Sequence, residues 1–137
     1  MSDSPSYEFQ KFVLAQLEAA SSVTDLVGTR IYGNPPDDVD FPYIRFGRMR
    51  TEPDDDNCRT VDVCLLNIDV FSRKGGWGEL RAICHAVKKV LHDLTLTLTT
   101  NALCNCSVLS IEEMDDPRDN ITVHGVVVVE ATIEDKT

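Results

Sequence analysis

The sequence predicts an α+β fold in which a mostly antiparallel sheet of about four to five strands has two main helices packed on one face. Residues 4–20 and 77–94 carry apolar side chains at three- and four-residue spacing, as amphipathic helices do. The other long segments alternate apolar and polar residues or hold β-branched runs, which is typical of strands. The resulting order of helix, two strands, helix and two strands favours helices on one side of an antiparallel sheet.

The first predicted helix has a recognisable start. Ser4 suits the N-cap, Pro5 suits the first helical position, and Glu8 lies where the helix dipole favours an acid. Residues 23–27 fit one further helical turn that ends at Gly28. The apolar face of the first helix consists of Phe9, Phe12, Val13, Leu17 and Ala20.

Three extended segments follow, separated by two acidic loops. We expect a short strand at 30–32, a strand at 43–50 and a long strand at 59–72, with the loops at 33–38 and 52–58. The apolar phase of the long strand changes at Leu65–Leu66. This change predicts either a bulge or a central strand that is covered on both faces.

The second half of the chain begins with a glycine-rich break over 72–78 and a helix over 77–94. Residues 94–98 alternate Leu and Thr, as an edge strand would. Two further strands, 106–114 and 121–133, should pair as a hairpin across the turn at 115–120. One face of the last strand contains Ile121, Val123, Gly125, Val127, Val129, Ala131 and Ile133.

The composition excludes several classes of function. The 137 residues suit one domain, 1–137, and a hydrophobic content of 42% argues against disorder. A net charge of −10 opposes gripping nucleic acid or anionic lipid over the whole surface, and no apolar run is long enough for a membrane span. Five cysteines without an export signal predict reduced thiols in a cytoplasmic protein.

No motif assigns a catalytic, cofactor-binding or metal-binding residue. The chain lacks H-E-x-x-H, G-x-S-x-G, a Walker loop and G-x-G-x-x-G. The single residue between Cys104 and Cys106 is too short a spacing for zinc, so these cysteines read as small buried hydrophobes. Residues 54–56 lack the pattern of a calcium loop. A small cytoplasmic adaptor or metal-binding domain nevertheless remains an alternative.

Four residues are candidates for a subunit interface: Arg45, Arg48, Arg50 and Trp77. The arginines could pair with Asp62 or Asp69 on the next strand, or they could meet acidic loops of a second copy. Trp77 could fix the second helix to the core or anchor an interface.

Acids gather in the loops rather than spreading evenly along the chain. They could be solvated loop residues that keep the protein soluble, or they could form an electrostatic surface with a function of its own. Those in the two loops before the long strand are Asp37, Asp38, Asp40, Glu52, Asp54, Asp55 and Asp56.

The order of short motifs resembles one protein family. The motifs are Val-Gly-Thr-Arg-Ile-Tyr at 27–32, Pro-Tyr-Ile at 42–44, a strand, Ser-Arg and glycine junction before a helix at 71–78, and an Arg-Asp turn before His-Gly and an apolar strand at 118–129. Together they are similar to the tail-completion, or tail-terminator, proteins of long-tailed phages and gene transfer agents. The resemblance covers nearly the whole chain.

The resemblance implies a non-catalytic α+β subunit without cofactors. Such subunits assemble into a hexameric ring that caps the tail tube, ends tail elongation and joins the tail to the head connector. The implied partners are other copies, the tail tube protein and the head–tail connector protein, while DNA passes through the ring without specific binding. In such a ring, the acids of the two loops would face the lumen or a ring face. The protein would be made in the bacterial cytoplasm and reside in the neck region of the virion.

Overall fold

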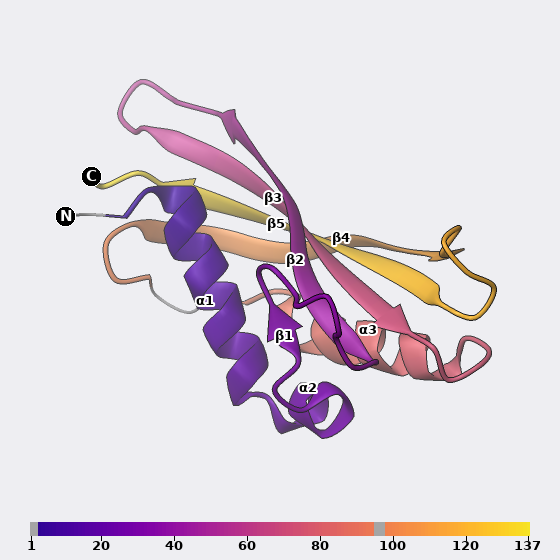
Figure 1. Cartoon of the computed structure of the whole chain (residues 1–137). Helices are drawn as coiled ribbons and strands as arrows, with labels where there is room; N and C mark the ends of the chain where they lie inside the picture. Colours follow the sequence, from indigo (N-terminus) through magenta and orange to yellow (C-terminus); the bar gives the residue numbers. More distant parts are fainter. Residues whose placement is uncertain (1–2, 95–97) are drawn as a thin grey trace.

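A computed structural model describes residues 3–94 and 98–137 (Figure 1). Its elements follow one another in an order close to the predicted one. They are α1 (Pro5–Ala19), α2 (Ser21–Val27), β1 (Ile31–Tyr32), β2 (Tyr43–Pro53), β3 (Val61–Ser72), α3 (Gly78–Leu91), β4 (Ala102–Asp115) and β5 (Val123–Glu134).

The strands form one five-stranded sheet in the order β1-β2-β3-β5-β4. The pairs β2–β3, β3–β5 and β4–β5 are antiparallel, whereas the two-residue β1 runs parallel to β2. The α+β prediction and the hairpin between the last two strands are therefore confirmed. The sheet is mixed because of one short parallel strand at its edge.

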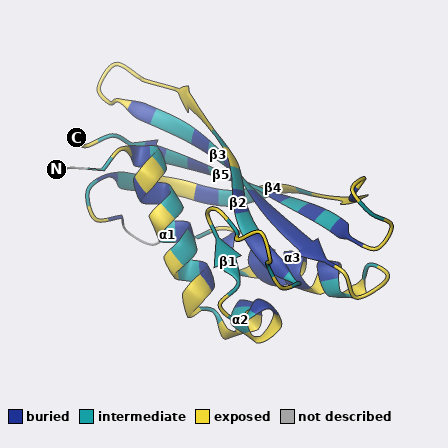
Figure 2. Ribbon diagram, in the orientation of Figure 1, coloured by how far each residue is buried: buried dark blue, intermediate teal, exposed yellow. Residues whose placement is uncertain are grey.

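The two long helices and the sheet enclose the core. Both α1 and α3 contact β3 and β5, while α2 packs mainly against the two other helices. The buried residues lie where these elements meet (Figure 2). The predicted pair of helices over the sheet is thus joined by a third, shorter helix that mainly packs on the other two.

The signals at the start of the chain act as predicted. Ser4 Oγ accepts a hydrogen bond from the Tyr7 N–H at 3.3 Å, and Pro5 occupies the first turn of α1. Phe9, Val13 and Leu17 are fully buried. Hydrophobic burial of this face holds α1 on the sheet, because a helix of this length is only marginal by itself.

Burial along β5 alternates at every residue, as a strand with one face on the core requires. At Gly125 a Cβ would lie 2.7 Å from Cys84 Sγ and 3.2 Å from Leu80 Cδ1, so glycine allows α3 to approach the sheet. The prediction that Ile121 faces the core is wrong, because Ile121 is 60% exposed and belongs to the turn before the strand.

The irregularity expected at Leu65–Leu66 lies on the neighbouring strand. Phe46 pairs with Ile68 and Met49 pairs with Leu66, so the extra residue belongs to β2 and not to β3. The other predicted explanation holds in part. β3 is a central strand that pairs on both sides, but burial alternates around Leu65 and becomes continuous only from Ile68 to Ser72.

Several boundaries differ from the prediction. β2 continues to Pro53, so Glu52 is a strand residue rather than a loop residue. β4 begins at Ala102, four residues earlier than expected. The edge strand expected over 94–98 falls largely on residues 95–97, which lie outside the described residues. No helix within the described ranges is both long enough and apolar enough to cross a bilayer.

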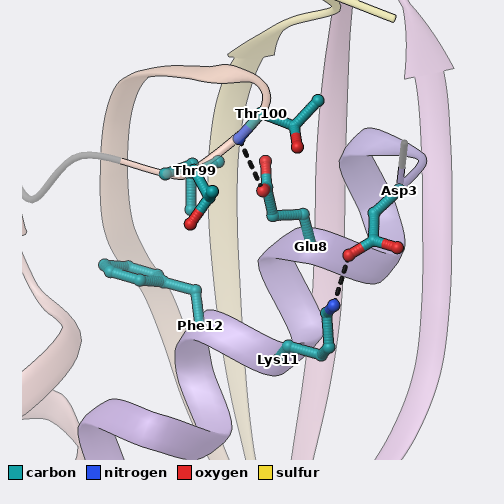
Figure 3. A pocket seen from close by; sticks show the side chains of 7 residues that line it. Asp3, Glu8, Lys11, Phe12, Thr99 and Thr100 are labelled. Carbon is teal, nitrogen blue, oxygen red and sulfur yellow. Dashed lines mark hydrogen bonds and ion pairs between the residues drawn. The ribbon is translucent and has the colours of Figure 1, made fainter. Parts of the chain in front are cut away.

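Glu8 joins distant parts of the chain beside a hollow of about 310 Å³ (Figure 3). Its carboxylate accepts hydrogen bonds from the N–H groups of Thr100 and Asn101, both at 2.8 Å. Asn101 Oδ1 in turn accepts the Lys136 N–H at 2.9 Å. Burial raises the pKa of Glu8, but the hydrogen bonds from Asn101 and Thr100 outweigh burial and lower it below its ordinary value.

Replacing Glu8 with Gln should destabilise the fold at neutral pH by about 1–3 kcal/mol. The amide NH2 of Gln would face one of the two backbone N–H groups, of Thr100 or Asn101, and could not accept its hydrogen bond. The folded-state pKa of Glu8 is lowered, so its contribution to stability is present above the ordinary value of 4.5 and is lost as pH falls through the folded value. Urea unfolding should therefore show a difference in unfolding free energy between wild type and Glu8→Gln at pH 7 that becomes smaller as the pH falls below 4.5. Glu18→Gln, an exposed change on α1, is the control; a gap independent of pH would contradict this role.

Candidate functional site

The short motifs that are spread along the sequence meet at one end of the sheet. The Arg30 backbone oxygen accepts the Ile44 N–H at 3.0 Å, and Arg30 Nε donates to the Pro42 backbone oxygen at 2.7 Å. Across the sheet, Tyr43 pairs with Phe71 and Phe71 pairs with His124. Four motifs that are far apart in the sequence thus meet at one end of the sheet. We call this region, which includes Arg30, Tyr43, Phe71, Arg73, Arg118 and His124, the arginine–aromatic end.

A row of rings crosses three strands at this end. The Phe41 and Tyr43 ring centroids lie 5.0 Å apart, and those of Tyr43 and Phe71 lie 4.9 Å apart. Phe71 and His124 stack at 4.3 Å with an interplanar angle of 9°. Such a row is rigid, since each ring limits the rotation of the next.

A buried carboxylate lies beside this row. Asp69 Oδ2 accepts a hydrogen bond from Arg45 Nη2 at 3.1 Å, and Asp69 Oδ1 lies 3.1 Å from His124 Nε2. A Cβ on Gly47 would lie 2.5 Å from Asp69 Oδ2 and 3.3 Å from the Asn67 backbone oxygen. Glycine at the irregular point of β2 therefore leaves the space in which Asp69 reaches both partners.

Arg73 lies over the Phe41 ring, with its guanidinium carbon 4.0 Å from the centroid. Its Nε donates to Thr122 Oγ1 at 2.8 Å, and its Nη2 lies 3.2 Å from Asp119 Oδ2. Hydrogen bonds from Thr122 and Ile121 hold the pKa of Asp119 at about 2. Asp119 thus stays ionised, accepts the hydrogen bonds that stabilise the turn before β5, and pairs with Arg73.

Arg118 is held in a similar way. Its Nε and Nη2 donate to the two oxygens of the buried Asp116, at 3.1 Å or less, and the guanidinium lies 5.9 Å from the Phe71 centroid. The hydrogen bonds from Arg118 outweigh burial and lower the pKa of Asp116. Planar bidentate pairing of this kind fixes the direction of a guanidinium that is otherwise exposed.

These groups line a polar hollow of about 810 Å³. Its walls are the 34–39 loop, Phe41, Tyr43 and the three arginines at 45, 73 and 118. Asp37 and Asp38 belong to the loop wall. The hollow can offer guanidinium donors, carboxylate acceptors and ring faces, which is the chemistry of a polar protein contact.

The structure does not bring the four predicted interface residues together. Arg45 lines the hollow and pairs with Asp69, which is one of the two acids predicted as partners of the arginines. The other acid, Asp62, lies opposite Pro53 in the strand register. Arg48 and Arg50 are exposed further along β2.

Trp77 is partly buried against the core, and the Arg81 guanidinium lies 5.7 Å from its ring centroid. Its packing fits the prediction that it fixes α3.

The predicted acids are divided as well. Asp55 Oδ1 accepts the Val61 N–H at 2.9 Å, and Asp56 Oδ1 accepts the N–H groups of Cys58 and Arg59. Hydrogen bonds from Cys58 and Arg59 lower the pKa of Asp56. These two acids therefore build the β2–β3 turn.

The remaining acids have other surroundings. Glu52 pairs with Arg50 at 2.6 Å. Within the described residues, no hydrogen bond or ion pair engages the side chains of Asp37, Asp38, Asp40 and Asp54.

Arg73, Arg118, Asp119 and His124 are site residues that sequence reasoning did not select. The signal was present, because all four lie in the motifs at 71–78 and 118–129. What the sequence could not show is that the two motifs meet across β3 and β5.

The prediction that Cys104 and Cys106 are small buried hydrophobes is wrong for Cys104. A register shift between Leu103 and Asn105 leaves Cys104 exposed while Cys106 is buried. Burial raises the pKa of Cys84 to about 12 and that of Cys106 to about 11, so these thiols are poor nucleophiles. Among residues 3–94 and 98–137, no group of three His, Cys, Asp or Glu side chains is placed to hold a metal ion.

The model of the family described as "Tail completion protein gp17" matches residues 11–134. The chain belongs to this tail completion family. The match includes every strand and the whole arginine–aromatic end. Membership makes the chain a structural protein of the phage tail, located in the virion.

A solved structure supports the fold of this tail completion protein. A chain from the "Virion of native gene transfer agent (GTA) particle" is 24% identical, with a TM-score of 0.82, and the match covers 89% of this chain and 91% of that chain. No protein with a curated description matches in sequence.

Replacing Gly47 with Ala should destabilise the protein by about 1–3 kcal/mol, because the new methyl group would displace the Asp69 carboxylate and overpack the site. Urea unfolding measures the loss, and a shift in the His124 ring resonances reports the broken contact. Gly33→Ala is the matched control, since a Cβ there meets nothing within 4 Å. Equal stability of the two variants would show that Asp69 does not need this space.

Proposed function

We propose that this protein closes the phage tail as a hexameric ring at the head-proximal end of the tail tube. The ring would stop addition of tube subunits and provide the joint to the head connector, through which DNA passes. The observation that carries the proposal is membership of the tail completion family over residues 11–134. The shared fold with a chain from a gene transfer agent virion supports it.

The role requires shape and contacts rather than catalysis. The buried cysteines are poor nucleophiles, and Arg45, Arg73 and Arg118 are each paired with a carboxylate. In a ring, two different patches of each subunit must meet, because identical patches give only a two-fold pair. Each copy carries a net charge of −10, so ring closure needs specific contacts that overcome repulsion.

The proposed partners are neighbouring copies, the tail tube protein and the head–tail connector protein. The exposed acids that take no part in the fold, Asp37, Asp38, Asp40 and Asp54, would face the lumen or a ring face. Negative charge there repels the phosphate backbone, so DNA would slide through without being held.

Deleting the gene tests the main role. We expect electron microscopy to show tails of uncontrolled length or tails that fail to join heads, because no ring ends tube growth. Supplying the wild-type gene from a plasmid should restore tail length and joining. Normal tails joined to normal heads in the deletion strain would overturn the proposal.

The role of the free acids has a separate test. Asp37, Asp38, Asp40 and Asp54, changed together to Asn, should leave tails assembled but lower DNA transfer per particle by up to about tenfold, because the lumen would then repel the phosphates less. The measurement is DNA transfer divided by particle count in the microscope. A control with Glu18→Gln and Asp25→Asn removes exposed acids from α1 and α2. Unchanged transfer in the first variant would remove this role while leaving the ring proposal standing.

A further inference from the structure

The sheet has two open edges. β1 aligns only with Ile44 and Arg45, so among residues 3–94 and 98–137 no strand lies on the outer side of β2 from the irregular point to Pro53. At the other side of the sheet, β4 is the last strand. Open strand edges present unpaired N–H and C=O groups, which readily pair with another chain.

Only the second half of β4 is open. The Val108 N–H donates to His92 Nδ1 at 3.0 Å, and the Leu94 N–H donates to the Cys106 backbone oxygen at 3.2 Å. The segment after α3 therefore covers β4 as far as Val108. Within the described chain, no backbone hydrogen bond reaches the outer side of 109–115.

The two open edges carry opposite charge. Residues 109–115, which we call the acidic edge, contain Glu112, Glu113 and Asp115 and no basic residue. Residues 48–53, which we call the arginine edge, present the exposed Arg48 and Arg50 and one acid, Glu52, which pairs with Arg50 at 2.6 Å. The two segments are also of similar length, seven and six residues.

Exposed apolar residues accompany the charges on the acidic edge. Leu109 is 53% exposed and Met114 is 38% exposed. Neither proline nor lysine, the usual guards of an edge strand, occurs between 109 and 115.

The key charges also lie on the same face of the sheet. Glu112 aligns with Val126, whereas Arg50 aligns with Leu65 and, through it, with Glu130. On β5 these positions alternate with the buried Val127 and Val129, so they belong to the face away from the core. If the sheet continued from one copy into another, Glu112 and Arg50 would remain on one side and could approach each other.

We propose that the acidic edge of one copy pairs as a strand with the arginine edge of the next copy. This inference rests on the proposed ring and names the contact that closes it. Backbone hydrogen bonds supply a continuous sheet across the boundary, and the Arg–Glu contacts select the partner and its direction. The contact is head-to-tail, because the two edges are different, and it lets strongly acidic chains meet at locally opposite charges.

Charge reversal in the full chain tests the pairing. One variant combines Glu112→Lys with Asp115→Lys, a second combines Arg48→Glu with Arg50→Glu, and a third carries all four changes. Each is supplied to the deletion strain, and the copies of this protein per purified tail are counted. We expect each single-edge variant to lose about tenfold or more in incorporation, and the four-fold variant to recover, because the charges are again opposite.

Two controls change the net charge by the same amounts elsewhere. Glu18→Lys with Asp25→Lys matches the first variant, and Lys88→Glu with Lys89→Glu matches the second; all four residues are exposed on helices. Wild-type incorporation of both edge variants would overturn the edge pairing. Loss without recovery in the four-fold variant would also overturn it and would indicate that these edges meet another tail protein. In either case the ring proposal is judged separately, by tail length in the deletion strain.

Cysteine trapping gives a readout that does not depend on charge. Glu112→Cys with Arg50→Cys, in a chain with Cys58→Ser and Cys104→Ser, should form disulfides between copies when assembled tails are oxidised. A ladder of linked chains on a non-reducing gel supports the pairing, and its last band counts the subunits in the ring. Glu112→Cys alone is the control. The absence of a ladder from tails that contain the double-cysteine protein would overturn the inference.

Discussion

Asp69 lies on the central strand β3 with only 6% of its surface exposed. Burying a carboxylate in this way costs free energy unless the charge is paired. Its two oxygens are used by Arg45 on one side and His124 on the other. These contacts link three strands, because Arg45 belongs to β2, Asp69 to β3 and His124 to β5. The row of rings adjoins these contacts, because His124 pairs with Asp69 and also stacks on Phe71. Without the space left by Gly47, the acid could not reach both partners.

The arginines of this acidic protein have two different surroundings. Arg45, Arg73 and Arg118 each pair with one nearby carboxylate, so their heads are held in fixed directions along one hollow. Arg48 and Arg50 lie beyond the irregular point of β2, away from this group. Each subunit thus separates a set of arginines that orders its own fold from a pair that faces outward. The net charge of −10 does not indicate these two groups of arginines, because only the strand register shows where each arginine lies.

Local signals were sufficient for much of the fold. The cap at Ser4, the spacing of Phe9, Val13 and Leu17, and the alternation along β5 depend on neighbours in the sequence, and the structure confirms them. The short parallel strand β1, the position of the irregularity in β2 and the exposure of Cys104 depend on which strand lies beside which. The sequence left Asp62 and Asp69 open as partners of the arginines, and the register of β2 and β3 selects Asp69 for Arg45. The meeting of Arg73 with Asp119 could not be predicted, because it links residues 46 positions apart through a turn.

The contacts of Glu8 and Asn101 bring the start of α1 close to the segment after β5, because Asn101 is hydrogen-bonded to the backbone of both Asp3 and Lys136 (Figure 1). Phe71 and His124 lie at the opposite end of the β3–β5 ladder from Val61 and Glu134, so both termini are remote from the arginine–aromatic end. An affinity tag or fluorescent domain fused to either terminus would therefore occupy the same side of the subunit. It would leave the hollow free, and a short linker between the native ends could close the polypeptide into a circle without crossing the sheet.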